Sequence, residues 1–145
     1  MKALSVMQPW ATLIALGAKH IETRSWHTSH RGQLAIHASG RMNREALLSL
    51  REPLVQEALT AGDYREGNGP ASNPFALPLG AVIAFVTLVD VRRITPENIP
   101  EEPERTFGDY APGRFAWFIK DVRRLPEPVP AKGALGLWEW EPLLL

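Results

Sequence analysis

Four side chains that can bind or transform a polar ligand lie close together near the start of the chain. They are Lys19, Glu22, Arg24 and Trp26, and all fall within the ten residues that begin at Gly17. A charged lysine anchors phosphate, whereas a lysine that burial has made neutral can act as a base. The guanidinium of Arg24 suits a phosphate or a base edge, and the carboxylate of Glu22 can accept an exocyclic amine or a proton. These residue types predict a polar site and leave both binding and catalysis open.

The same side chains also have purely structural interpretations. Glu22 and Arg24 are two residues apart, so in an extended segment they project to one side and can pair with each other. Lys19 follows a helix-ending glycine, and the negative helix end favours its charged form while burial opposes it. Trp26 can stack on a base or pack against the protein. For Trp10, which lies on an apolar helical face, we favour packing in the core.

Basic residues are concentrated around this group, although the chain as a whole has no net charge. Between Ala15 and Arg51 there are six lysines and arginines against two acids, and all four histidines lie in the same window. A local basic surface can steer an anionic ligand even on a neutral protein, although uneven charge is also common on solvated surfaces. We expect Arg31 and Arg41 to contact the backbone of such a ligand.

The residue inventory predicts no metal and no cofactor. The chain has no cysteine, which excludes thiolate chemistry and Cys-ligated metal sites. His27 and His30 have a spacing that permits a metal, with Glu22 and His37 as conceivable partners, but no full set of three ligands is identified. Serines near these histidines lack the turn and oxyanion motif of a nucleophile, and no glycine-rich phosphate loop is present.

Hydrophobic periodicity and turn residues predict the elements that must hold these side chains. Extended segments are expected at Lys2–Met7, His20–Trp26, Gly32–Ala38, Gly80–Arg92, Arg114–Arg123 and Leu135–Glu141. Helices are expected at Pro9–Leu16 with Gly17 as terminator, after a cap at Asn43, and from Pro53 to Gly62. The segment Gly80–Arg92 has almost no polar face, so we expect both of its sides to be covered.

Two segments lack a clear period. Asp63–Leu79 is rich in glycine and proline in its second half, and a loop of this length is usually functional or mobile. Three alternating prolines, Pro126, Pro128 and Pro130, predict an extended connector before the last strand. Five or six short strands with inserted helices predict an α+β fold, a small mixed β-barrel in a single domain, residues 1–145.

Composition places the chain among globular proteins. Its 145 residues are 45% hydrophobic, which is enough for one buried core without disulfides or metals. The N-terminus lacks a long apolar stretch, and the longest apolar run, Gly80 to Val89, is too short to span a bilayer. We expect a cytoplasmic protein with no membrane partner, in agreement with the absence of cysteine.

The chain resembles the ASCH (activating signal cointegrator 1 homology) domain family over nearly its whole length. The family signature Gly-x-Lys-x-x-Glu-x-Arg matches at Gly17, Lys19, Glu22 and Arg24. Further similarity lies in the runs Leu4 to Ala11, Arg31 to Ala38 and Gly133 to Trp138. The resemblance implies a PUA-like β-barrel, a fold known for RNA binding, with a cleft beside the signature.

The resemblance also implies possible enzymatic branches. Some family members are small amidohydrolases that deacylate N4-acylated cytidines with a Lys, a Thr and a Glu, and at least one is described as a ribonuclease. Lys19 matches that lysine, whereas Glu22 stands where the threonine would be, and the distant glutamate has no identified counterpart.

Three hypotheses for function result. The first is a binding module that holds RNA or a modified nucleotide in a cleft lined by Lys19, Glu22, Arg24 and Trp26, with Arg31 and Arg41 on the backbone. The second is a metal-independent hydrolase, a nucleoside amidohydrolase or ribonuclease, with Lys19 and Glu22 as its acid–base pair. The third is a protein-interaction module in transcription or translation.

Overall fold

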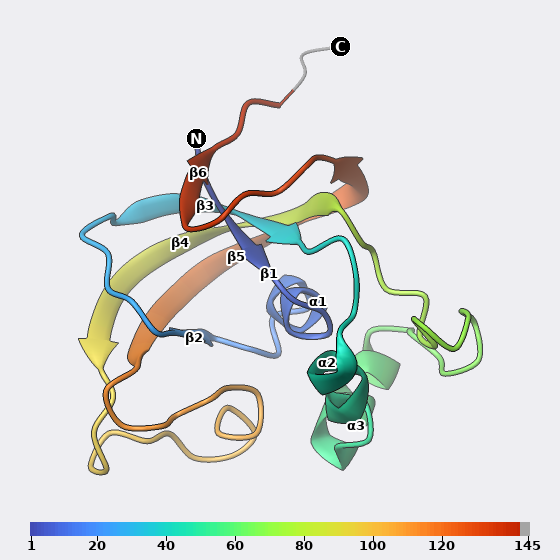
Figure 1. The fold of residues 1–145 in the computed structure, drawn as a ribbon, viewed down its shortest axis with the longest axis horizontal. Helices are drawn as coiled ribbons and strands as arrows, with labels where there is room; N and C mark the ends of the chain where they lie inside the picture. The colour runs from blue at the N-terminus through green and yellow to red at the C-terminus, as the bar shows by residue number, and fades with distance from the viewer. Residues whose placement is uncertain (143–145) are drawn as a thin grey trace.

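One six-stranded sheet forms the frame of the molecule in a computed structural model, which describes residues 1–142. The strands are β1 (Lys2–Val6), β2 (Ile21–Arg24), β3 (Gly32–Ala38), β4 (Ala81–Arg93), β5 (Phe115–Pro130) and β6 (Leu137–Glu139). Their order is β2-β5-β4-β3-β1-β6, with β1 and β3 parallel and the other neighbours antiparallel. The predicted α+β class and mixed sheet are confirmed, although the barrel is a curled sheet with β2 and β6 as its edges (Figure 1). Residues 143–145 of the predicted domain lie outside the described part.

Three short helices complete the fold: α1 (Trp10–Ala15), α2 (Arg44–Ser49) and α3 (Pro53–Ala61). Helix α1 packs against β3, β4 and β5, and α3 packs against α1. Gly17 follows α1 with a φ of +76°, the left-handed conformation that favours glycine. The predicted cap of α2 is also present, because the Asn43 side chain accepts a hydrogen bond from the N–H of Ala46 at 2.8 Å. Within residues 1–142, no helix has the length and hydrophobicity needed to cross a bilayer.

The concave face of the sheet and α1 enclose the main apolar core. Its most buried large members, each at most 1% exposed, are Leu4, Val6, Ile14, Leu34, Ile36, Val86, Leu88 and Trp117. Burial of each large aliphatic side chain contributes about 1.5–3 kcal/mol. Strand β2 is held at the edge of this core, because Glu22 lies opposite Trp117 and Arg24 lies opposite Phe115 in the antiparallel register. The core therefore fixes the backbone that carries the charged signature.

The outer face of the sheet is covered over only part of its length. The covered part is an apolar cluster that the C-terminal segment completes: Ala3, Ala35, Val82 and Trp140. Farther along β4, Val89 is 42% exposed and Arg92 is exposed. The prediction that both sides of Gly80–Arg92 are covered is therefore correct for the first half of the strand and wrong for the second, whose outer side chains Val89 and Arg92 stay exposed among the described residues.

Strand β5 is longer than predicted. The segment 126–130, expected to be a connector, continues the strand, since Val129 pairs with Val82 and Pro130 with Ala81. Strand β2 pairs with β5 only at Phe115–Phe118, so the later part of β5 lies at an edge of the sheet. A proline without an N–H is tolerated at such an edge, which is why the prolines do not end the strand.

The segment Asp63–Leu79 forms neither helix nor strand, as predicted, but it packs against the fold. Phe75 and Leu77 are 3% exposed and join an apolar cluster with residues of α1 and α3. The side chain of Asn73 donates to the carbonyl of Leu77 at 2.9 Å and accepts from its N–H at 3.1 Å. These contacts make the end of the loop a part of the second core.

Candidate functional site

A pocket of about 550 Å³ lies beside the charged signature. Strand β2 contributes Glu22, Thr23 and Arg24; helix α1 contributes Trp10; and helix α2 contributes Glu45, Leu48 and Ser49. The segment before β5 contributes residues 106–109 and Arg114. A pocket of this volume falls within the range of small-ligand sites.

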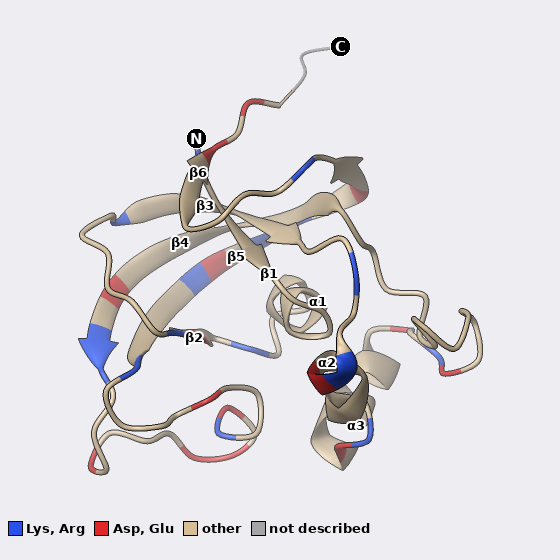
Figure 2. Cartoon of the chain, viewed as in Figure 1, with Lys and Arg blue, Asp and Glu red and all other residues tan. Residues whose placement is uncertain are grey.

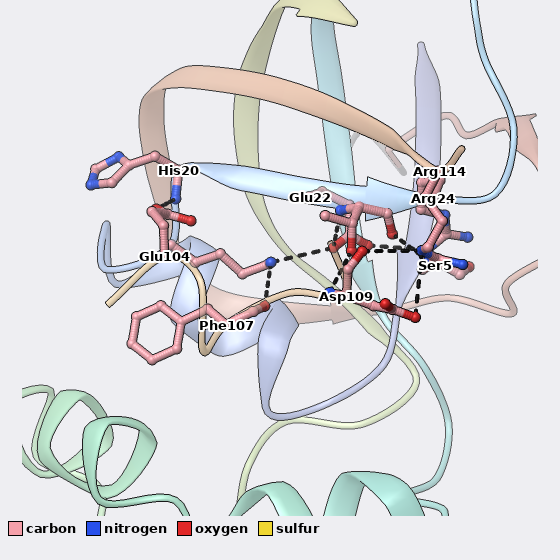
Figure 3. A network of polar contacts seen from close by, with 10 residues as sticks. Ser5, His20, Glu22, Arg24, Glu104, Phe107, Asp109 and Arg114 are labelled. Carbon is pink, nitrogen blue, oxygen red and sulfur yellow. Dashed lines mark hydrogen bonds and ion pairs between the residues drawn. The ribbon is translucent and has the colours of Figure 1, made fainter. Parts of the chain in front are cut away.

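Glu22 is fixed in the wall of this pocket between two cationic side chains (Figure 3). Its Oε2 lies 3.1 Å from Nη1 of Arg24, and its Oε1 lies 3.6 Å from Nζ of Lys19. Oε1 also accepts a hydrogen bond from the N–H of Thr23 at 3.2 Å. The predicted pairing of Glu22 with Arg24 is confirmed. Because both oxygens have partners, the carboxylate presents a defined acceptor geometry to the pocket.

Lys19 is buried behind the pocket and does not line it. Its Nζ donates to the carbonyl oxygen of Phe107 at 2.6 Å (Figure 3). Burial lowers the pKa of Lys19 below its usual value, and the nearby carboxylates of Glu22 and Glu104 oppose that shift. Sequence reasoning named both burial and charge as influences but placed this lysine in direct reach of a ligand. In the structure, Lys19 reaches the pocket through Glu22.

Glu104 is a second carboxylate near Lys19 that no sequence motif indicated. It accepts a hydrogen bond from the N–H of His20, and burial raises its pKa against the opposing effects of that bond and of Lys19. Among the described residues, its Oε2 and the hydroxyl of Tyr110 are buried without hydrogen-bond partners. Burial, Glu104 and Glu22 together raise the pKa of Tyr110. Since 84 residues separate His20 from Glu104, only the tertiary fold brings this group together.

Two arginines supply hydrogen-bond donors to the pocket. Nη1 of Arg24 donates to Glu22 and, at 3.4 Å, to the carbonyl of Ser5, which links β2 to β1. Nε of Arg114 donates to the carbonyl of Asp109 at 3.1 Å, and its Nη2 donates to that of Thr23 at 3.3 Å. Arg114 was not among the predicted site residues, because it lies outside the signature and only starts a predicted strand.

Besides Lys19, three predicted site residues lie outside the pocket lining: Trp26, Arg31 and Arg41. Trp26 packs edge-on against Trp117 with ring centroids 4.8 Å apart, and the Arg24 guanidinium lies 5.8 Å from its ring centroid. Arg31 is exposed and donates to backbone carbonyls of its own turn. Arg41 is exposed before α2. The basic window of the sequence therefore does not form one surface around the pocket.

The pocket itself is lined by more acids than bases. Its four carboxylates, against the guanidiniums of Arg24 and Arg114, belong to Glu22, Glu45, Glu52 and Asp109. This surplus disfavours a phosphate inside the pocket and favours a neutral or cationic group that carries hydrogen-bond donors. Trp10 packs against two apolar clusters and also lines the pocket, so it adds an apolar wall.

The histidines do not gather around this pocket. Residues 1–142 contain no group of three or more histidine, aspartate or glutamate residues that could hold a metal ion. His37 is buried on the outer face of the sheet, where Nδ1 lies 2.9 Å from Oγ of Ser5 and Nε2 lies 2.7 Å from the carbonyl of Ala131. The contact between His37 and Ala131 attaches the segment after β5 to the sheet.

The chain is similar to proteins of a known family. The family model for the ASCH domain matches residues 4–128. The chain is 29% identical over 140 residues to activating signal cointegrator 1 of Mus musculus and 30% identical over 139 residues to that of Homo sapiens. Each match covers 94% of this chain and 22% of the relative, so the chain spans about a fifth of the length of these proteins.

Among solved structures, the chain is similar to the crystal structure of ASCH from Zymomonas mobilis. The TM-score is 0.48 at 14% sequence identity, and the match covers 89% of this chain and 72% of that chain. The family model spans most of the chain and includes the segment Gly17 to Arg24, whose last three residues line the pocket. The chain belongs to the ASCH domain family.

Proposed function

We propose that this chain binds RNA by holding the base of an unpaired or modified nucleotide in the pocket beside Glu22. The carboxylate of Glu22 carries the proposal, because it lies in the pocket wall with Arg24 on one oxygen and Lys19 on the other. Carboxylates accept hydrogen bonds from exocyclic amines, as in the readout of cytosine N4. Membership of the ASCH family, whose PUA-like fold is associated with RNA binding, supports the same class of ligand.

The rest of the pocket wall suits a base better than a phosphate. Trp10 offers an aromatic surface for stacking, which is a common way to hold an unpaired base. Arg24 and Arg114 offer N–H groups for a ring nitrogen or a carbonyl. The acidic surplus keeps the phosphate groups of the nucleotide outside the pocket.

Calorimetric titration with cytidine, adenosine and uridine tests this function. We expect cytidine or adenosine to bind at least about 10-fold more tightly than uridine, which lacks an exocyclic amine. Glu22→Gln should weaken binding about 10-fold, because an amide offers one oxygen where the carboxylate offers two. Glu57→Gln, an exposed substitution on α3, is the matched control and should bind as the wild type does. The proposal fails if no nucleoside binds, or if Glu22→Gln binds as tightly as the wild type.

A second candidate function is metal-independent hydrolysis of a nucleoside amide or an RNA phosphodiester. It is favoured by the contact between Glu22 and Lys19, whose pKa burial lowers, since such pairs are common in acid–base catalysis. Glu22 would take a proton from water, and Lys19 would set its basicity. Glu104, beside Lys19, is the candidate for the distant glutamate of the amidohydrolase branch.

Incubation of N4-acetylcytidine and of RNA with the protein in EDTA separates the two functions. Hydrolysis that Glu22→Gln and Lys19→Met both abolish supports the enzyme. Binding of N4-acetylcytidine without turnover supports the binding module alone. Turnover that survives both substitutions contradicts the assigned acid–base pair.

A further inference from the structure

A second charged surface lies on the outer face of the sheet, on the side opposite the main core. We define this outer basic face by four exposed residues of three neighbouring segments: Arg31 before β3, Arg92 on β4, and Lys120 and Arg123 on β5. Asp90 and Asp121 are the acids of these strand segments, so the bases outnumber them. Figure 2 shows charged residues of both signs along β4 and β5, at a distance from β6.

The strand register places the β5 members of this face side by side. Lys120 lies opposite Thr87 and Arg123 lies opposite Phe85. Thr87 and Phe85 are two residues apart on β4 and therefore point to the same side. Ile119, the chain neighbour of Lys120, belongs to the concave core. Lys120 and Arg123 consequently project outward together.

Asp90 holds the other end of the face in a defined geometry. Its Oδ2 lies 2.6 Å from Nε of Arg92, and its Oδ1 lies 3.9 Å from Nη2 of Arg31. Asp90 is opposite Phe118 in the register, and the Arg92 guanidinium lies 5.4 Å from the centroid of that ring. Asp90 and Phe118 thus hold the guanidinium of Arg92, and Asp90 draws that of Arg31 toward the same place.

Within residues 1–142, the C-terminal segment leaves this half of the outer face uncovered. Trp140 packs on the other half, and its ring centroid lies 6.0 Å from that of Phe85, the partly buried register partner of Arg123 at the boundary of the covered part. The side chain of Arg92 remains 67% exposed. In Figure 1, β6 lies away from the tip of β4.

We propose that the outer basic face binds the sugar-phosphate backbone of RNA; the choice of RNA as partner rests on the proposed function. Guanidinium groups match phosphate oxygens in geometry and charge, and such contacts position a strand without reading its sequence. The pocket cannot supply them, because its own lining has a surplus of carboxylates. When one base of a strand occupies the pocket, phosphates elsewhere along the strand can bind to another surface, and this face has the required sign and exposure.

The test is the salt dependence of binding to a short single-stranded oligocytidine, measured by fluorescence anisotropy. Each phosphate contact on a single strand contributes about 0.7 to the slope of log affinity against log salt. The double variant Lys120→Gln/Arg123→Gln should therefore make the slope less steep by about 1.4. This corresponds to about a 25-fold loss of affinity for oligocytidine at ~0.1 M salt relative to 1 M. The matched control Arg65→Gln/Lys132→Gln removes two exposed charges outside this face and should retain the wild-type slope.

Two further measurements, calorimetry with free cytidine and binding to duplex DNA, separate failure of the outer-face proposal from failure of the proposed function. Calorimetry with free cytidine reads the pocket alone, and we expect the double variant of the outer face to bind cytidine as the wild type does. If the wild type does not bind cytidine, the proposed function is wrong, while the salt slope still tests the outer face. An unchanged slope in Lys120→Gln/Arg123→Gln overturns the outer-face proposal whatever the pocket binds. Binding to duplex DNA as tight as to the oligocytidine overturns the choice of RNA.

Discussion

The pocket and the outer basic face both carry charged residues, but they hold them in opposite ways. In the pocket, the Glu22 side chain is 9% exposed and lies between Lys19 and Arg24. On the outer face, the Asp90 side chain is 38% exposed, and the arginines that share it remain open to solvent. Acids predominate in the first region and bases in the second. A chain of zero net charge can therefore separate recognition of a base from recognition of phosphates.

Burial also changes what each charge contributes to the folded state. A pair removed from water depends on its partners, because an unpaired buried charge is costly. An exposed pair contributes little to stability and keeps its charge available to a ligand. The two regions should consequently respond differently to the same substitution.

Replacement of each region's lysine by methionine should give the largest difference. Lys19→Met removes the hydrogen bond to Phe107 and leaves Glu22 and Glu104 without their shared cation. We expect the free energy of unfolding to fall by about 3–5 kcal/mol, the usual cost of breaking a buried pair. Lys120→Met, on the outer face, should change it by less than about 0.5 kcal/mol. Urea denaturation of both variants measures the contrast.

Equal stability of the two methionine variants would contradict the assignment of Lys19 to a buried network. A second variant, Lys19→Met/Glu22→Gln, sharpens the result. It removes the carboxylate left unpaired by the first substitution, so it should be destabilised by less than the sum of the single variants.

The pH dependence of the free energy of unfolding should also distinguish the regions, by less than the methionine substitutions do. Burial lowers the pKa of Lys19 from its usual value of 10.5. Between the folded-state pKa and 10.5, the unfolded chain binds more protons at this site, so stability rises with pH, by at most about 1.4 kcal/mol per pH unit. At lower pH the cost of the buried ammonium is fully present.

Urea denaturation of the wild type and of Lys19→Met from neutral pH to about pH 9.5 measures this effect. The advantage of the wild type over Lys19→Met should grow across the upper part of that range. An advantage that shrinks with rising pH would show that burial does not lower this pKa. The range ends there because Tyr110, whose pKa burial raises, ionises in the unfolded chain at higher pH.

Local signals in the sequence predicted most of the elements and two residues of the pocket wall, Glu22 and Arg24. The conformation of Gly17, the cap at Asn43 and the bounds of Gly32–Ala38 depend on neighbouring residues, and all three were predicted correctly. The pairing of Glu22 with Arg24 depends only on strand alternation. Such features can be read from the chain because the interactions that cause them are short in sequence.

Features that depend on distant contacts were not predicted. The depth of Lys19 and its proximity to Glu104 arise from how the segment before β5 folds back on β2. The segment 126–130 can continue strand β5 because β2 does not pair with this part, so its prolines lie at an edge of the sheet. Arg31 was grouped with the signature by position in the chain, whereas the turn after β2 carries it to Asp90. Sequence proximity is a poor guide to a shared surface when a chain reverses within a few residues.

Single arginine substitutions should separate base binding from backbone binding by about 5- to 10-fold. Arg24→Gln removes a pocket donor and the partner of Glu22, so its affinity for cytidine should fall about 10-fold. Arg92→Gln removes one phosphate contact, so its affinity for oligocytidine at ~0.1 M salt should fall about 5-fold while cytidine binding is unchanged. Paired titrations with cytidine and oligocytidine measure both. A loss of cytidine binding in Arg92→Gln would join the two regions into one site.

The smallest expected effect is a gain, and it comes from removing an acid of the outer face. Asp90 holds Arg92 and lies near Arg31, and the hydrogen bond from Arg92 is the main reason that the pKa of Asp90 is lowered. In Asp90→Asn both guanidiniums are released toward a phosphate, so oligocytidine should bind about 3-fold more tightly at low salt. The gain should vanish at high salt, where screening removes the field of the carboxylate. The counterpart in the pocket is Asp109→Asn. A strand bound by its base keeps its phosphates outside the pocket and away from Asp109. This substitution should therefore raise the affinity for oligocytidine by less than Asp90→Asn does. A larger gain from Asp109→Asn would mean that phosphates enter the pocket and that the division between the two regions is wrong.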